Sequence, residues 1–181
     1  YFYKNAMEKM ERKIKLTPNE VELAFENSTR RYISDLKQGK GFSHGYNRTY
    51  ENTITDSVLG SLGEVAWAKA SNTFFNNSYS DSYARYTDSD FQNNIEIRTQ
   101  NKQNYNFLLI RPDEKKGKYV LVIHEGTNRT EKLKFNFSIM GWFPFYKEMP
   151  ERLSDFGHPN RPAAYRVEVK ELYDINEIKK I

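Results

Sequence analysis

DFQNNIEIRT, residues 90–99, decides how the centre of this 181-residue chain is interpreted. Asp90 stands at the end of one predicted strand, and Glu96 lies on the next one. Asn93 and Asn94 between them are typical turn residues, because a short amide side chain tolerates left-handed backbone and bonds its own backbone. The two carboxylates are therefore expected to come together where two neighbouring strands meet.

A third carboxylate precedes this stretch on a predicted helix. Residues 63–70, GEVAWAKA, belong to a run whose apolar spacing near three and four predicts a helix from about 55–57 to about 71. Two glycines inside a helix cost about 1 kcal/mol each against alanine, so close packing against a neighbour is expected. Glu64 is expected to point into a protein-lined space, because the other residues on its helical stripe are Gly60, Trp67 and Ala68.

An earlier helix is marked by its start signals. Thr17 can cap it, Pro18 suits its first turn, and Glu20 can reach back to complete a capping box. Apolar residues at helical spacing then continue to about Lys37. Residues 1–16 are expected to form a flexible N-terminal segment.

From residue 83 onward the hydrophobic period shifts towards two, which predicts strands. The run Tyr119–Ile123 is apolar without interruption, as expected of a central strand buried on both faces. Turn residues between the strands predict mostly antiparallel neighbours in a meander, with helices on one face. The predicted strands are Tyr83–Phe91, Ile95–Gln100, Phe107–Arg111, Tyr119–His124, Leu133–Ile139 and Ala164–Val169, with a short helix or turn around Pro144 to Met149.

Composition limits the class of protein. With 38% hydrophobic and 15% aromatic residues, the chain has material for one core, so a single α/β domain over residues 1–181 is expected. Its central sheet is expected to be mixed, mostly antiparallel and flanked by helices. The absence of cysteine excludes a disulfide framework and a thiolate metal site. No apolar run approaches the roughly 20 residues of a membrane-spanning helix, so an intracellular location without membrane contact is expected.

Cations and aromatic rings alternate in the loop at residues 39–53. Lys40 and Arg48 interleave there with Phe42 and Tyr46, within a chain whose net charge of +4 is a mild bias towards anionic partners. Cations neutralise phosphate and rings stack on bases, so this loop is a candidate nucleic-acid contact. An ordinary solvated loop is the competing interpretation. Lys102 follows the strand of Glu96 and is a further candidate contact.

The order of a helix carboxylate, an aspartate and a Glu-x-basic strand resembles the PD-(D/E)XK nuclease superfamily. The resemblance covers roughly residues 57–142 and implies a restriction-endonuclease-like core. It implies a Mg²⁺ or Mn²⁺ site and a DNA substrate. The implied metal ligands are Asp90, Glu96, the backbone carbonyl of Ile97 and, as a supporting acid, Glu64. Arg98 replaces the lysine of the motif, and it can clamp phosphate or stabilise transition-state charge because its guanidinium stays protonated.

The chain is also similar to phage-encoded proteins that share an ordered set of short motifs. In this sequence the motifs are Gly63-Glu64-Val65-Ala66, Asp90, Ile97-Arg98-Thr99, Tyr119–Ile123 and Gly141-Trp142. The resemblance implies a phage nuclease that hydrolyses DNA phosphodiesters with Mg²⁺ in the host cytoplasm. The alternative is an inactive protein of the nuclease fold that binds nucleic acid or a partner protein. The sequence leaves the oligomeric state open, a homodimer included.

Structural interpretations compete with each of these assignments. Asp88 and Asp90 are in a run typical of turns, and Glu96-Ile97-Arg98 is typical of an exposed strand face with cross-strand ion pairs. Glu168-Val169-Lys170 matches the Glu-x-Lys motif literally, but it lies on the last predicted strand without a preceding helix acid and aspartate. His124 ends a buried strand and is expected to be packed instead of acting as a base.

Overall fold

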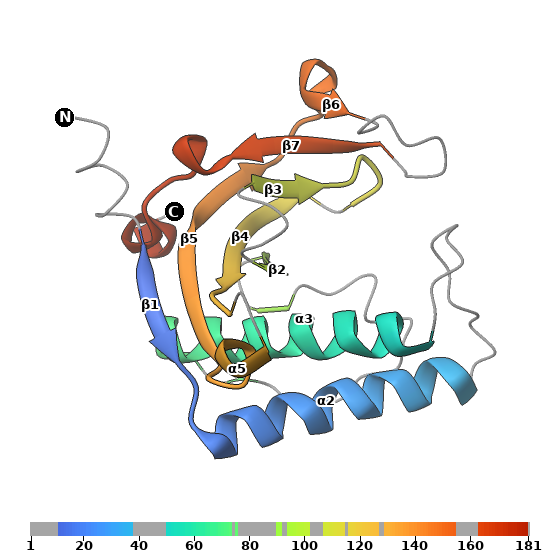
Figure 1. Cartoon of the computed structure of the whole chain (residues 1–181). Coiled ribbons are helices and arrows are strands. Elements are labelled where there is room, and N and C mark those ends of the chain that lie inside the picture. The colour runs from blue at the N-terminus through green and yellow to red at the C-terminus, as the bar shows by residue number, and fades with distance from the viewer. Residues whose placement is uncertain are drawn as a thin grey trace.

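Two β-sheets lie face to face, one long helix covers the outer face of the larger sheet, and a second long helix packs on the first (Figure 1). The arrangement is an α/β fold with mixed, mostly antiparallel strands, as the sequence predicts, but the strands form two sheets where one central sheet is expected. It is seen in a computed structural model, in which the described residues are 11–37, 50–73, 75, 90–91, 94–101, 107–114, 116–126, 129–154 and 163–180.

The larger sheet, sheet A, has its strands in the order β1-β5-β4-β2. They are β1 (Arg12–Lys15), β2 (Ile95–Asn101), β4 (Gly117–His124) and β5 (Asn136–Phe145). β2 runs parallel to β4, whereas β5 runs antiparallel to both β4 and β1. β2 is therefore an edge strand of sheet A.

The smaller sheet, sheet B, is antiparallel and has the order β3-β7-β6. Its strands are β3 (Phe107–Ile110), β6 (Leu153–Ser154) and β7 (Ala164–Glu168). The chain leaves sheet A after β2, adds β3 to sheet B, and returns to sheet A as β4. The predicted meander is wrong at this point, because this excursion makes β2 and β4 parallel neighbours where a hairpin would have made them antiparallel.

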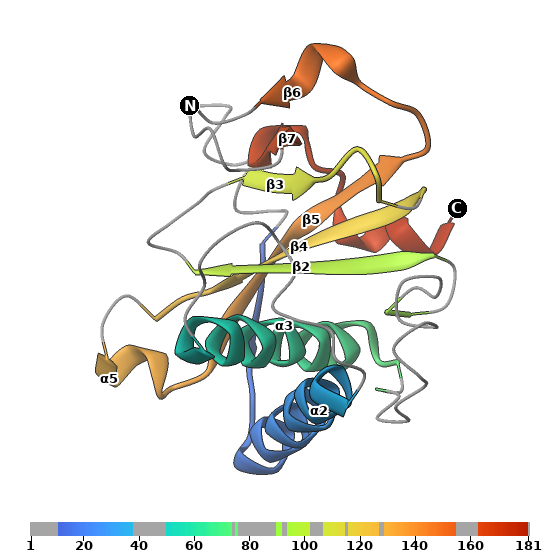
Figure 2. The same ribbon diagram turned by 90° about the vertical axis from the view of Figure 1, so that its right-hand side faces the viewer.

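The helix α2 (Pro18–Lys37) begins with the capping box that the sequence predicts. The backbone N–H of Glu20 donates to Thr17 Oγ1 at 3.4 Å, and the N–H of Thr17 donates to Glu20 Oε2 at 2.6 Å. The helix α3 (Tyr50–Ser71) ends as predicted but begins several residues before the predicted start. Figure 2 shows α3 between α2 and sheet A.

Short helices complete the fold. The helix α5 (Arg129–Lys132) connects β4 to β5. Three 3₁₀ helices follow later in the chain, at Pro150–Arg152, Val169–Glu171 and Ile175–Lys180. The turn predicted around Pro144 begins only after Phe145, because β5 starts later than predicted and extends further.

The strand β4 forms the centre of the core and is buried along its whole length, as predicted. Val120 and Val122 contribute to a cluster with α3, while Tyr119, Leu121 and Ile123 contribute to a cluster with sheet B. Apolar side chains on both faces of one strand therefore join the helices, sheet A and sheet B.

One of the two glycines of α3 explains how closely this helix approaches β2. A Cβ atom added at Gly63 would lie 1.8 Å from the Thr99 hydroxyl oxygen. A Cβ at Gly60 would meet nothing within 4 Å. Close packing is therefore confirmed for Gly63 and wrong for Gly60.

The Gly-Trp motif connects β5 to the C-terminal segment. Gly141 has a φ of +141°, which favours glycine, and its Cβ would lie 2.7 Å from the carbonyl oxygen of Tyr173. Trp142 exchanges two backbone hydrogen bonds with Tyr173, and its indole N–H donates to the carbonyl of Asp174 at 3.0 Å. This motif therefore has a structural role, which the sequence did not predict.

Two predicted segments differ from the structure. Residues 12–15 of the expected flexible segment form the strand β1. Most of the predicted strand 83–91 lies outside the described residues, and at its end Asp90 occupies a bend. Phe91 forms only an isolated antiparallel bridge with Ile95.

Candidate functional site

Glu64 is buried between the two long helices, as the composition of its stripe predicts. Its side chain is 9% exposed, and both carboxylate oxygens accept hydrogen bonds from Arg31 of α2. The distances are 2.6 Å from Nη1 to Oε1 and 2.7 Å from Nη2 to Oε2. Such a bidentate ion pair combines charge attraction with a fixed geometry.

Asp90 lies beside the edge strand β2. Its Oδ2 accepts a hydrogen bond of 2.7 Å from the backbone N–H of Ile97, in the middle of the Glu96-Ile97-Arg98 triplet. The N–H of an edge strand has no partner strand on that side, so a side-chain acceptor satisfies it. The aspartate is thereby fixed next to the triplet, although it is not on a strand of its own as predicted.

Glu96 and Arg98 face away from α3. Side chains alternate along a strand, and Ile95 and Ile97 of β2 pack in the cluster that contains α3 residues. Arg98 points to the other face, because its guanidinium carbon lies 5.2 Å from the ring centre of Tyr119, which belongs to the cluster with sheet B. Glu64 on α3 and Glu96 on β2 therefore approach one another from different sides of the edge strand.

Arg98 is held by several acceptors. Its Nη2 donates to Glu114 Oε2 at 2.5 Å, from the turn between β3 and β4. Its Nη1 lies 3.9 Å from Glu96 Oε2 and donates to the carbonyl of Ile97 at 3.4 Å. The Arg98 side chain as a whole is 31% exposed, although its guanidinium is surrounded by these acceptors.

The charges of this cluster influence one another. The pKa of Glu64 is raised to about 7, first by burial and then by the neighbouring charges of Asp90 and Glu96, while Arg31 opposes this shift. Burial acts to lower the pKa of Arg98, but the carboxylates of Glu114, Asp90 and Glu96 raise it above its ordinary value. The carboxylates therefore lie close enough to interact electrostatically.

The described groups of the cluster carry an excess of negative charge. Four carboxylates and two guanidinium groups leave a net charge of −2 above the Glu64 pKa of about 7, and of −1 below it, where Glu64 holds a proton. The carboxylates are those of Glu64, Asp90, Glu96 and Glu114, and the guanidinium groups are those of Arg31 and Arg98. One divalent cation would neutralise this excess.

Two of the predicted metal ligands fit a Mg²⁺ ion better than the others. Mg²⁺ is usually bound by one or two carboxylates plus water and substrate phosphate. Asp90 and Glu96 can supply the carboxylates. Glu64 and the carbonyl of Ile97 already accept hydrogen bonds from guanidinium groups. Within the described part of the chain, no group of three or more His, Asp or Glu side chains is arranged to hold a metal ion.

The predicted nucleic-acid contacts are not among the described residues, and two residues of the cluster were not among the predicted ones. Lys40, Arg48 and Lys102 lie outside the described residues. Arg31 and Glu114 were not predicted. Neither residue had a signal in the sequence, because Arg31 is one of many polar residues of α2 and Glu114 is in an ordinary turn.

The competing residues have structural partners. Glu168 accepts a hydrogen bond of 2.6 Å from Arg166 and takes part in a capping box with Glu171. His124 is packed as predicted, with its ring 4.9 Å from that of Phe137, and burial lowers its pKa. Neither residue lies within the carboxylate cluster.

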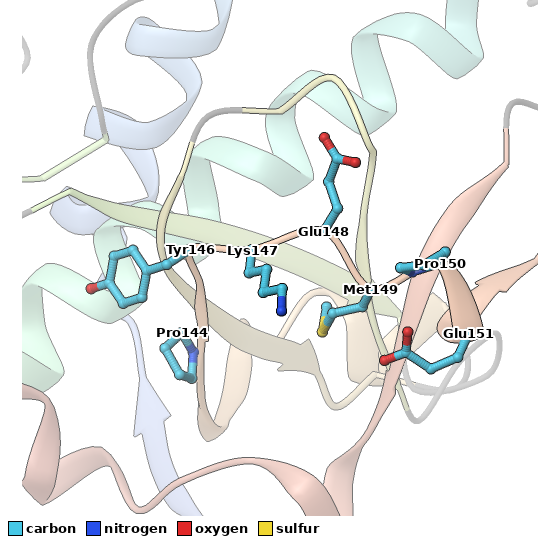
Figure 3. A pocket seen from close by; sticks show the side chains of 7 residues that line it. All are labelled: Pro144, Tyr146, Lys147, Glu148, Met149, Pro150 and Glu151. Atoms are coloured by element: carbon cyan, nitrogen blue, oxygen red, sulfur yellow. The ribbon is translucent and has the colours of Figure 1, made fainter.

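A shallow hollow of about 470 Å³ lies elsewhere on the surface (Figure 3). A single segment forms it, and its lining residues are Pro144, Tyr146, Lys147, Glu148, Met149, Pro150 and Glu151. It contains none of the predicted site residues. The hollow therefore does not contribute to the carboxylate cluster.

Comparisons with known proteins found no match: no family model, no curated protein and no solved structure is significantly similar to the chain. Of the helices in the described residues, none combines the length and the apolar character needed to cross a membrane. A functional assignment therefore has to rest on the chemistry of the carboxylate cluster.

Proposed function

We propose that this chain is a nuclease that hydrolyses DNA phosphodiester bonds with Mg²⁺ or Mn²⁺, on a restriction-endonuclease-like core. The observation that carries the proposal is the grouping of Glu64, Asp90 and Glu96, whose charges interact around two guanidinium groups. Carboxylates that lie close together repel one another, and a bound divalent cation would offset this repulsion. The position of α3 against β2, with an acid on each, agrees with such a core.

Each residue of the cluster has a distinct role in this proposal. Asp90 and Glu96 hold the cation, and Glu64 is the supporting acid that Arg31 keeps in place. A bound divalent ion supplies polarisation of the phosphoryl oxygen and a lower pKa for bound water. Arg98, whose side chain is 31% exposed, binds the phosphate and stabilises the charge that develops on it.

A second candidate is a protein of the same fold that binds nucleic acid or a partner protein without cleavage. One observation favours it: the two arginines already satisfy several acceptors of the cluster. Guanidinium groups that hold carboxylates in this way can take the place of a cation. The two candidates therefore differ in whether Asp90 and Glu96 bind a metal.

Calorimetric titration with Mn²⁺, followed by cleavage assays on single- and double-stranded DNA, tests the proposal. We expect binding and cleavage by the wild type, and the loss of both in Asp90→Asn and Glu96→Gln. Glu168→Gln is the matched control, because it changes the other Glu-x-basic triplet outside the cluster. A wild type that binds no Mn²⁺ and cleaves no DNA would favour the second candidate.

A further inference from the structure

The helix α2 exposes an apolar stripe on the side that faces away from α3. Phe25, Ile33 and Leu36 are 45%, 44% and 54% exposed, and Thr29 lies between them at helical spacing. The opposite side of the helix carries Ala24 and other buried residues. Figures 1 and 2 both show α2 as the outermost of the described layers.

The stripe is self-complementary when a second α2 lies antiparallel across it. With Thr29 opposite its own copy, Phe25 of one chain lies opposite Ile33 of the other, and the same contact repeats by symmetry. Leu36 of each chain then lies at one end of the contact, next to Glu22 of the other chain. A small residue at the centre permits close approach of the two helices.

Charges beside the stripe follow the same symmetry. The first half of α2 exposes Glu22 and Glu26, whereas the second half exposes Arg30 and Lys37. Antiparallel pairing places the acidic half of one helix along the basic half of the other, with Glu22 near Lys37 of the second copy. A parallel arrangement would instead bring like charges together.

We propose that this face of α2 binds a second copy of the chain in an antiparallel, two-fold symmetric dimer. The charge pattern identifies the occupant, because the helix complements itself at both ends. Arg31 points to the other side of α2, towards Glu64, so the dimer leaves the carboxylate cluster uncovered. The proposal is independent of the proposed nuclease activity.

Sedimentation of the full chain over a concentration series tests the dimer. We expect the wild type to pass from monomer to dimer and Leu36→Glu to stay monomeric. Leu153→Glu is the matched control, because Leu153 is exposed to a similar extent, at 45%, on β6 at the opposite end of the molecule (Figure 1). A wild type that is monomeric up to about 1 mM would overturn the dimer, since even weak complexes form there. A dimer that persists in Leu36→Glu would overturn this surface.

An exchange of charges tests the antiparallel direction. Glu22→Lys alone and Lys37→Glu alone should each weaken the dimer about tenfold, because each creates a like-charge contact twice by symmetry. The double variant Glu22→Lys/Lys37→Glu should regain the wild-type dissociation constant. A double variant as weak as the single ones would overturn the antiparallel arrangement. Circular dichroism of each variant checks that α2 remains helical.

Discussion

Arg31 and Glu64 form a bidentate ion pair between α2 and α3, in which the two carboxylate oxygens accept hydrogen bonds of 2.6 and 2.7 Å. The glutamate is almost completely buried, while the arginine side chain is 22% exposed. Burial of a lone carboxylate is costly, so the position of Glu64 depends on this guanidinium. The planar fork of arginine matches the carboxylate in a way that a lysine ammonium cannot.

Removal of Arg31 should therefore destabilise the protein. We expect Arg31→Met to lower the free energy of unfolding by roughly 3 kcal/mol at pH 8, because an ionised Glu64 would lose its partner. Arg31→Met/Glu64→Leu should recover most of this loss, since no charge stays buried. Urea denaturation measures both. Arg30→Met is the control, because its exposed contact with Glu26 at 3.8 Å contributes less than about 1 kcal/mol.

The raised pKa of Glu64 predicts a stability that falls as pH rises. Between its ordinary pKa of 4.5 and the native value of about 7, the folded state holds a proton that the unfolded state releases. The free energy of unfolding should therefore decrease through this range, by roughly 3 kcal/mol between pH 4.5 and 8. Glu64→Gln does not titrate and serves as the reference. The difference between wild type and Glu64→Gln, measured in urea at several pH values, should show this slope, and a flat difference would contradict it.

Periodicity and cap signals predicted the type of most described elements, but they did not predict the partners of those elements. The capping box at Thr17 and the buried run of β4 are local features, so the sequence was sufficient for them. β2 and β4 are parallel because β3, which lies between them in the sequence, pairs with β7 in sheet B. No local sequence pattern predicts this pairing of β3. Arg31 and Glu114 were missed for the same reason: each joins the cluster through a contact between distant segments.

Arg98 offers the clearest kinetic prediction. If the site is active, Arg98→Ala should reduce Mn²⁺-dependent cleavage about a hundredfold, since a charged contact to the transition state is worth on the order of 3 kcal/mol. Arg98→Lys should retain or raise the rate. The control is Arg166→Ala, because Arg166 also contacts a carboxylate, Glu168, and lies 4.1 Å from the ring of Phe107, but in sheet B. Equal rates in Arg98→Ala and wild type would exclude a catalytic role.

The two glycines of α3 should respond in opposite ways to alanine. Gly63→Ala places a Cβ against Thr99 and should destabilise the protein by about 2 kcal/mol, because α3 must move away from β2. Gly60→Ala has space and should stabilise it by about 0.5–1 kcal/mol, since alanine favours the helix. Thermal or urea unfolding distinguishes the two. A Gly63→Ala variant as stable as the wild type would contradict the close approach.

DNA binding should weaken steeply as salt rises, because lysine and arginine contacts release counterions from the phosphate backbone. Replacement of Lys40 and Arg48 by glutamine should reduce the slope of log affinity against log salt by roughly 2. Fluorescence anisotropy with a labelled oligonucleotide measures this slope. Lys134→Gln, in the turn that follows α5, is the control for the loss of a single positive charge outside this loop. Binding that does not depend on salt would argue for a protein partner instead.

The pairing of β1 with β5 has a consequence for how the chain reaches its native state. Ser138 of β5 donates a hydrogen bond of 2.6 Å to Glu11, next to β1, across 127 residues of sequence. During synthesis, α2 and α3 leave the ribosome well before β4 and β5, the strands that their apolar faces need. The early chain is therefore exposed to aggregation until β5 emerges, and closure of this long loop makes slow folding the expectation.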